Sequence, residues 1–181
     1  MNTHQKRIKY IQQLLKKHNC DAFLSFCPID NRYLSGFTGS TSAILITQED
    51  SFFISDFRYE EQAGYEVTNY SILIVSGGIE KEIFRLIRSF KIKRIALNSE
   101  KISLRFSEDI KKKKIELIGI NEELSQLRLI KQSNEIQYIR EACKITEQSV
   151  FNCLSLLKEG VTEREISAKI DYEFRMQGAD G

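Results

Sequence analysis

Histidine and cysteine are scarce in this sequence and poorly placed for metal binding. His4 and His18 are the only two histidines. Both lie on or at the end of an amphipathic stretch near the start, without carboxylates at ligand spacing, so we interpret them as solvated surface residues. The four cysteines lack CxxC spacing, which favours reduced, buried thiols over disulfides or a zinc site. They are Cys20, Cys27, Cys143 and Cys153.

Long apolar runs and a strong net charge are absent as well. No run approaches the roughly 20 residues that span a bilayer, so we expect no membrane segment. The formal net charge of +2 is too small to indicate a nucleic-acid surface. The first nine residues are polar and lack the plan of a secretory signal, so we expect a cytoplasmic protein. What remains, 41% hydrophobic and 29% charged residues, is typical of a globular chain with a sizeable core.

The first third of the chain predicts a helix, a buried strand and a hairpin. Thr3 is a candidate N-cap for an amphipathic helix that ends near His18. Residues 22–27 form a short, almost wholly apolar run, the pattern of a strand buried on both faces. Residues 42–47 and 51–55 flank a short polar turn and predict a β-hairpin.

From residue 71 onward, strand and helix patterns alternate. This rhythm predicts an α/β fold with helices on both faces of a sheet, and the hairpin makes that sheet mixed. Ser76-Gly77-Gly78 precedes a helix, but without GxGxxG or GxxxxGK[ST] a simple turn is favoured over a phosphate site. The predicted strands are 71–75, 94–97 and 115–118, and the predicted helices are 79–89 and 103–113.

Residues 31–40 combine aromatic rings, two glycines and hydroxyl groups between two apolar runs. We interpret them as a shaped loop in which Gly36 and Gly39 take positive φ and hold Tyr33 and Phe37 outward. Loops of this kind often carry recognition. The alternative is a tight connection whose two rings plug the edge of the core.

Asp56 and Arg58 lie at a junction between a strand and a helix. Capping of the helix by the Asp56 carboxylate explains that residue without a chemical role. Arg58 has two interpretations. Its planar guanidinium group either pairs locally or meets a substrate or partner carboxylate.

Around residues 121–133 the pattern changes from short strands to long helices, which marks the predicted domain boundary. An apolar stripe then follows one helix, and Gly160 fits its C-terminal cap. Thr162 and Glu165 form a capping box that starts a second helix, Glu163 to Gln177. Two helices cannot close a core, so we expect their apolar stripes to need a sheet that follows Gly181.

Four segments, in this order and spacing, resemble one family of metallopeptidases. The chain is similar to the amino-terminal part of Xaa-Pro aminopeptidases and proline dipeptidases, which share a two-domain plan with creatinase. The similarity spans nearly all of the chain. The segments are 31–40 (NRYLSGFTGS), 56–63 (DFRYEEQA), 127–131 (LRLIK) with Glu135, Ile136, Ile139, Arg140 and Ala142, and 159–163 (EGVTE).

The resemblance implies a creatinase-like N-terminal domain over residues 1–124. Residues 125–181 would then be a linker and the first two helices of an incomplete pita-bread catalytic domain. In the family, two divalent metal ions, commonly manganese, cobalt or zinc, are held by two Asp, one His and two Glu of that domain. All five ligands would lie beyond Gly181, so we expect no catalytic residue, metal or cofactor site in this chain, and no activity from it alone.

The implied activity is hydrolysis of the peptide bond before proline, by a water held between the two metals. This portion would serve subunit association in a homodimer and substrate gating, with Tyr33, Phe37 and Arg58 as the gating residues and a peptide as the substrate. Two alternatives stay open. The chain is a non-catalytic dimerisation or interaction module, or it belongs to a creatinase-like amidinohydrolase.

Overall fold

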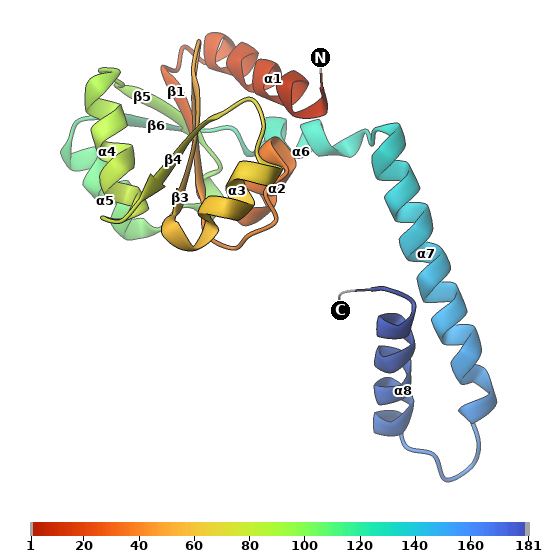
Figure 1. The fold of residues 1–181 in the computed structure, drawn as a ribbon. Coiled ribbons are helices and arrows are strands. Elements are labelled where there is room, and N and C mark those ends of the chain that lie inside the picture. Colours follow the sequence, from red (N-terminus) through yellow and green to blue (C-terminus); the bar gives the residue numbers. More distant parts are fainter. Residues whose placement is uncertain (1, 180–181) are drawn as a thin grey trace. The chain divides into compact units, whose positions relative to one another are not determined.

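In the computed structural model, which describes residues 2–179, the chain divides into two units. Unit 1 is Met1–Ser125 and unit 2 is Gln126–Gly181, a division one residue from the one that we drew from the sequence. Figure 1 shows the sheet and its helices in unit 1 and the helices of unit 2.

A six-stranded mixed sheet forms the centre of unit 1, in the order β4-β3-β2-β1-β5-β6. β2 pairs antiparallel with β1 and β3, whereas β1/β5, β5/β6 and β3/β4 are parallel pairs. The predicted mixed sheet and its hairpin are therefore confirmed. The strands are β1 (Ala22–Ser25), β2 (Ala43–Thr47), β3 (Ser51–Asp56), β4 (Ser71–Val75), β5 (Arg94–Leu97) and β6 (Glu116–Gly119).

Helices cover both faces of this sheet, as the alternating pattern predicted (Figure 1). α4 and α5 pack on one face, where Leu24, Leu45 and Ile54 join one apolar cluster with Leu86 and Phe106. α1, α2 and α3 lie on the other face. The helices are α1 (Thr3–Lys17), α2 (Pro28–Ser35), α3 (Glu60–Glu66), α4 (Ile79–Ser89) and α5 (Leu104–Lys112), with short 3-10 turns η1 (Phe57–Tyr59) and η2 (Ser99–Lys101).

Local signals set most of these boundaries. Residues 71–75, 79–89 and 94–97 form β4, α4 and β5 with the predicted bounds. One predicted cap is wrong. Asn2, not Thr3, has the extended backbone of an N-cap, and its side chain accepts from the backbone N–H of Gln5. Thr3 is the first residue of the helix because Asn2 already supplies that acceptor.

Unit 2 consists of helices in the part of the chain that the structure describes. α6 (Asn121–Leu129) crosses the division between the units, and α7 (Ser133–Cys153), η3 (Leu154–Leu156) and α8 (Glu163–Met176) follow. The predicted capping box is present: Thr162 accepts from Glu165, whose carboxylate accepts from Thr162. Gly160 is not a cap of α7, because α7 ends at Cys153 and Gly160, at φ 91°, lies in the connection to α8.

The predicted apolar stripe of unit 2 is largely uncovered. Ile136, Ile139 and Leu157 are 40%, 49% and 61% exposed, and only Ser149 and Cys153 are buried among the residues of α7. No residue of α8 is buried in the described part of the chain. Apart from its contact with α8, the stripe on α7 therefore has no apolar partner layer within the residues described.

Candidate functional site

The segment that we interpreted as a loop is half helix. Residues 31–35 belong to α2, which begins with Pro28 at its first turn and ends at Ser35. Proline suits that position because its fixed φ matches the helix and its missing N–H has no intrahelical partner there. Gly36 takes a left-handed conformation, φ 88°, and its N–H bonds to Arg32 O, so it caps the helix. Only residues 36–42 form the connection to β2.

Phe37 does not point outward, which corrects the sequence interpretation. Its side chain is 1% exposed and packs edge-on against Phe53 and Tyr59, with ring centroids 4.8 Å and 5.5 Å apart. Gly39 is not at positive φ. Instead, a Cβ at Gly39 would overlap the Phe37 ring and lie 2.8 Å from Tyr59 Cε1. The alternative that Phe37 plugs the core is therefore correct, and Gly39 is needed for space.

Tyr33 is half-buried and held by α1. The Arg7 guanidinium carbon lies 3.5 Å from the Tyr33 ring centroid, and Arg7 Nη1 donates to Tyr33 O at 2.6 Å. His4 Nδ1 lies 3.2 Å from Leu34 O, which also accepts from Tyr70 Oη. These groups satisfy the last carbonyls of α2, which have no partner within the helix. Burial, and then the Arg7 charge, lower the pKa of His4.

Arg58 is the exposed member of the three candidates, with a side chain 59% accessible. Its Nε and Nη2 donate to the two carboxylate oxygens of Asp56 at 2.9 and 2.7 Å. Asp56 also accepts from Arg58 N at 3.1 Å, which confirms its capping role. The hydrogen bond from Arg58 lowers the pKa of Asp56. Two of the five N–H groups of the guanidinium are used in this pair.

A polar clamp that the sequence did not indicate fixes residues 38–40. Glu66 accepts from both Thr38 N and Thr38 Oγ1 at 2.7 Å, and Gln62 Nε2 lies 3.0 Å from Glu66 Oε1. Ser40 Oγ and Tyr59 Oη are 2.8 Å apart. Burial raises the pKa of Glu66, but the hydrogen bonds from Thr38 and Gln62 lower it on balance. The partners are 19 and 28 residues apart, so no local pattern predicts them.

Tyr59 links the candidates that come together. Its ring meets Phe37 on one side, and the Arg58 guanidinium carbon lies 5.5 Å from its centroid. Phe37 and Arg58 therefore belong to one packed group, whereas Tyr33 contacts Arg7 of α1. The exposed Arg58 guanidinium in this group can bind an anion, and the packing of Tyr59 on the buried Phe37 supports it from below.

Residues 2–179 contain neither a metal-ligand cluster nor a membrane-spanning helix. No group of three or more histidine, cysteine, aspartate or glutamate side chains there is arranged to hold a metal ion. No helix in that range is both long and apolar enough to cross a membrane.

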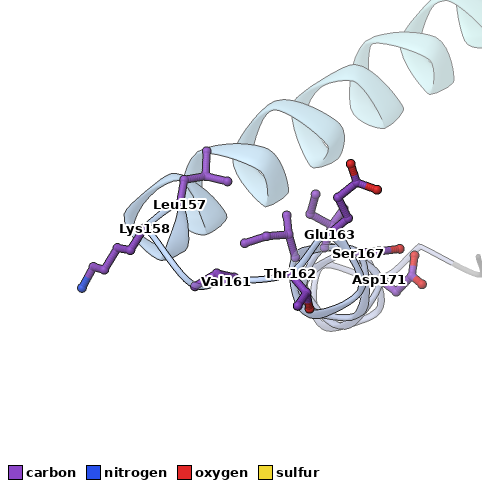
Figure 2. A pocket seen from close by; sticks show the side chains of 9 residues that line it. Leu157, Lys158, Val161, Thr162, Glu163, Ser167 and Asp171 are labelled. Atoms are coloured by element: carbon purple, nitrogen blue, oxygen red, sulfur yellow. The ribbon is translucent and has the colours of Figure 1, made fainter.

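A hollow of about 510 Å³ lies in unit 2, lined by the connection that follows η3 and by the first turns of α8. Leu157, Val161, Ile166 and Ile170 give it an apolar lining, and Asp171 lies at its side. Figure 2 shows Val161 and Thr162 on the connection, with Glu163, Ser167 and Asp171 following along α8. Ile166 and Ile170 are four residues apart and so share one helix face, the spacing of a packing surface.

Comparison with known proteins identifies a domain family and a sequence relative. The model of the Creatinase/Prolidase N-terminal domain matches residues 7–130. An uncharacterized peptidase of Bacillus subtilis, YqhT, is 31% identical over 96% of this chain and 50% of its own length.

Solved structures agree with the sequence relatives. The Xaa-Pro dipeptidase from Bacillus anthracis superimposes with a TM-score of 0.92 at 27% identity, over 98% of this chain and 50% of that one. The X-Pro aminopeptidase from Thermotoga maritima gives 0.83 at 34% identity, over 90% and 48%. The chain thus spans about half the length of these relatives. It belongs to the creatinase/prolidase N-terminal domain family.

Proposed function

We propose that this chain is the amino-terminal part of a metal-dependent Xaa-Pro aminopeptidase or dipeptidase, which hydrolyses the peptide bond before proline. The observation that carries the proposal is the similarity along nearly the whole chain, both units included, to an Xaa-Pro dipeptidase and an X-Pro aminopeptidase. Unit 1 supplies subunit association in a homodimer and one border of the substrate entrance. Unit 2 supplies the first helices of the catalytic domain.

Two divalent metal ions, manganese, cobalt or zinc, belong to this proposal and would activate the attacking water and polarise the scissile carbonyl. Residues 2–179 do not fit them, because no cluster there has the necessary ligands. No catalytic step is therefore assigned to a residue of this chain. Its part in the proposed reaction is to admit and orient the peptide.

Arg58 is the residue that we assign to peptide recognition. Its guanidinium is exposed on one side and anchored by Asp56 on the other, so its direction is fixed before a ligand arrives. A peptide carboxylate would bind it with charge-assisted hydrogen bonds, roughly twice as strong as neutral ones. Phe37 acts in this proposal as a support of the Arg58 surface, through Tyr59, whereas Tyr33 packs on Arg7 of α1, outside that group.

The test is a chimera of residues 1–181 with the remaining half of the Bacillus subtilis relative, assayed on Xaa-Pro dipeptides and longer Xaa-Pro peptides with added metal. We expect metal-dependent hydrolysis. Creatine, as a second substrate, distinguishes a creatinase-like amidinohydrolase. A folded, metal-loaded chimera that hydrolyses creatine and no Xaa-Pro peptide would refute the proposal.

In the same chimera, Arg58→Ala should change kcat/KM or the preference for peptide length by about tenfold while leaving Tm nearly unchanged, because surface ion pairs contribute little stability. Arg105→Ala is the matched control, since Arg105 is an exposed arginine of α5 on the other face of the sheet. Equal kcat/KM and equal length preference for the two variants would refute the role of Arg58 in peptide recognition.

The second candidate function is a non-catalytic interaction module. The observation that favours it is the exposed apolar surface of α7 and α8. An active chimera, together with an inactive 181-residue chain, would favour the peptidase.

A further inference from the structure

The outer edge of β4 is open. β4 is an edge strand that pairs only with β3, in parallel. Ser71 is exposed and the four residues that follow, Ile72 to Val75, are half-buried and apolar, without proline or charge. Within residues 2–179, no loop or helix backbone bonds to this strand. Such an edge presents a row of N–H and C=O groups to which another strand can pair.

The opposite edge of the sheet is different. β6 has four residues and begins with Glu116, whose carboxylate pairs with Arg94 Nε at 3.1 Å. Charged side chains on an edge strand oppose the addition of a further strand. Of the two edge strands, β4 is longer by one residue, and it alone carries no charged side chain.

A groove of about 420 Å³ runs beside the β4 edge. Ile74, Val75 and the turn Ser76-Gly77-Gly78 line one part of it, and Lys81, Arg85 and Arg88 of α4 line another. The three cations recur at intervals of four and three residues, so they share one face of the helix. A Cβ at Gly77 would lie 3.8 Å from Lys81 Nζ, which places that ammonium group beside the turn.

The charge of this groove is unbalanced. Glu82 is its one acidic side chain, and it pairs with Arg85. Lys81 and Arg88 have no ion pair among the residues that the structure describes. The open edge strand therefore has two uncompensated cations beside it.

We propose that the β4 edge and its groove bind an acidic peptide segment in extended conformation, added to the sheet as a seventh strand. Main-chain hydrogen bonds to β4 provide affinity in this mode, and alternate side chains provide specificity. Carboxylates on one face of the added strand meet Lys81 and Arg88, and apolar side chains on its other face extend the layer formed by Ile72 and Ile74.

A second copy of this chain is a poor occupant. An antiparallel β4 pair has a local two-fold axis perpendicular to the sheet, so the two α4 helices would lie on the same face. Their basic rows, Lys81 to Arg88, would then be neighbours of like sign, which disfavours the pair. An acidic peptide has the opposite charge and avoids this repulsion.

The experiment uses the 181-residue chain and a short synthetic peptide of alternating glutamate and valine. Affinity is measured by calorimetry, and amide hydrogen exchange of residues 71–75 is followed with and without peptide. One comparison peptide has lysine in place of glutamate. The other carries N-methyl groups on alternate amides, which removes strand pairing and keeps the charge.

The variant K81E/R88E tests the groove, with K9E/K16E as the control of equal charge change on exposed residues of α1. We expect the acidic peptide to bind, to slow exchange of residues 71–75, and to bind about tenfold more weakly to K81E/R88E. The control should bind within about twofold of the parent chain. The lysine peptide and the N-methylated peptide should not bind measurably.

Several results would overturn the proposal. These are no binding of the acidic peptide, equal binding of the N-methylated peptide, or an equal loss in K9E/K16E. Competition by inorganic phosphate without protection of residues 71–75 would mean an anion site only. Protection of these residues by self-association, in the absence of peptide, would identify a second copy as the occupant. If K81E/R88E fails to fold, the difference in binding between the acidic peptide and its N-methylated form tests the proposal by itself.

Discussion

The two units differ in how they cover their apolar residues. In unit 1, β1 and β2 are buried along their whole length, and Phe23, Phe37 and Phe53 are 0 to 1% exposed. In unit 2, Phe151, Leu157 and Met176 are 61 to 68% exposed. Full burial of such a side chain stabilises a fold by about 1.5–3 kcal/mol, so unit 1 has this contribution and unit 2 largely lacks it.

Unit 2 relies on local helical interactions instead. Capping boxes start α7 and α8, and Lys169 pairs with Glu173 four residues later at 2.8 Å. Pairs of this kind contribute about 0.2–0.5 kcal/mol each. The surface around Arg58 is therefore supported by a closed core, whereas the described residues of unit 2 form helices without one.

The largest expected effect comes from emptying the core of unit 1. Phe37→Ala should lower the free energy of unfolding of unit 1 by about 3–5 kcal/mol, because a buried ring is lost and a cavity remains. Phe151→Ala is the matched change in unit 2 and should cost far less, since its ring is 68% exposed. Urea unfolding followed by circular dichroism measures both. Equal losses of unfolding free energy in Phe37→Ala and Phe151→Ala would contradict the difference in burial between the two units.

The second effect concerns the space at Gly39. Gly39→Ala should destabilise unit 1 by about 1–3 kcal/mol, because the added Cβ forces the Phe37 ring to shift. Gly160→Ala in unit 2 meets no heavy atom within 4 Å, and its strain at φ 91° is confined to the connection before α8. It should leave the unfolding of unit 1 unchanged. A Gly39→Ala protein as stable as the parent chain would contradict the packing described for Phe37.

A smaller effect is expected from the clamp on residues 38–40. Glu66→Gln should cost about 1 kcal/mol, because the charge-assisted bonds from Thr38 are weakened. The folded-state pKa of Glu66 is lowered, so its contribution is present above pH 4.5 and is lost as pH falls through the lower folded value. Urea titrations at several pH values should show a shallower decline in the variant. If the stability of Glu66→Gln and of the parent chain fell equally with decreasing pH, Glu66 would not contribute to the pH dependence.

The smallest effect concerns His4. Its folded-state pKa lies below 6.5, so the unfolded chain takes up the proton first and stability falls as pH drops from about 6.5 to the folded value. His4→Asn should remove this decline while leaving stability at neutral pH little changed. Melting curves between about pH 5 and 7.5 test it. A decline of the same size in the variant would assign it to another group.

Sequence patterns predicted the elements whose signals are local. β4, α4 and β5 had the predicted bounds, because an apolar run, a glycine-marked start and a second apolar run follow one another there. The role of Phe37 was mistaken because Gly36 and Gly39 were taken as equivalent. Gly36 is needed for its positive φ, whereas Gly39 is needed for the space beside the Phe37 ring.

Other parts of the site depend on contacts far apart in the chain. The Glu66 clamp on Thr38 joins residues 28 positions apart, and no periodicity indicates it. Arg7 and His4 did leave a signal. With Ile8 and Ile11 they recur at three- and four-residue spacing, so the buried Arg7 and the half-buried His4 share the core-facing side of α1. The interpretation of His4 as a solvated surface residue is therefore wrong.

Hydrogen exchange across the 181-residue chain tests the central claim most directly. Amides of the central strands, 22–25 and 43–47, should exchange only on global unfolding of unit 1. Amides of α8, 163–176, should exchange orders of magnitude faster, because its apolar face is uncovered. This result would mean that unit 1 has a closed core and that the apolar face of α8 is uncovered in solution. Equal protection of the central strands and α8 would contradict the account.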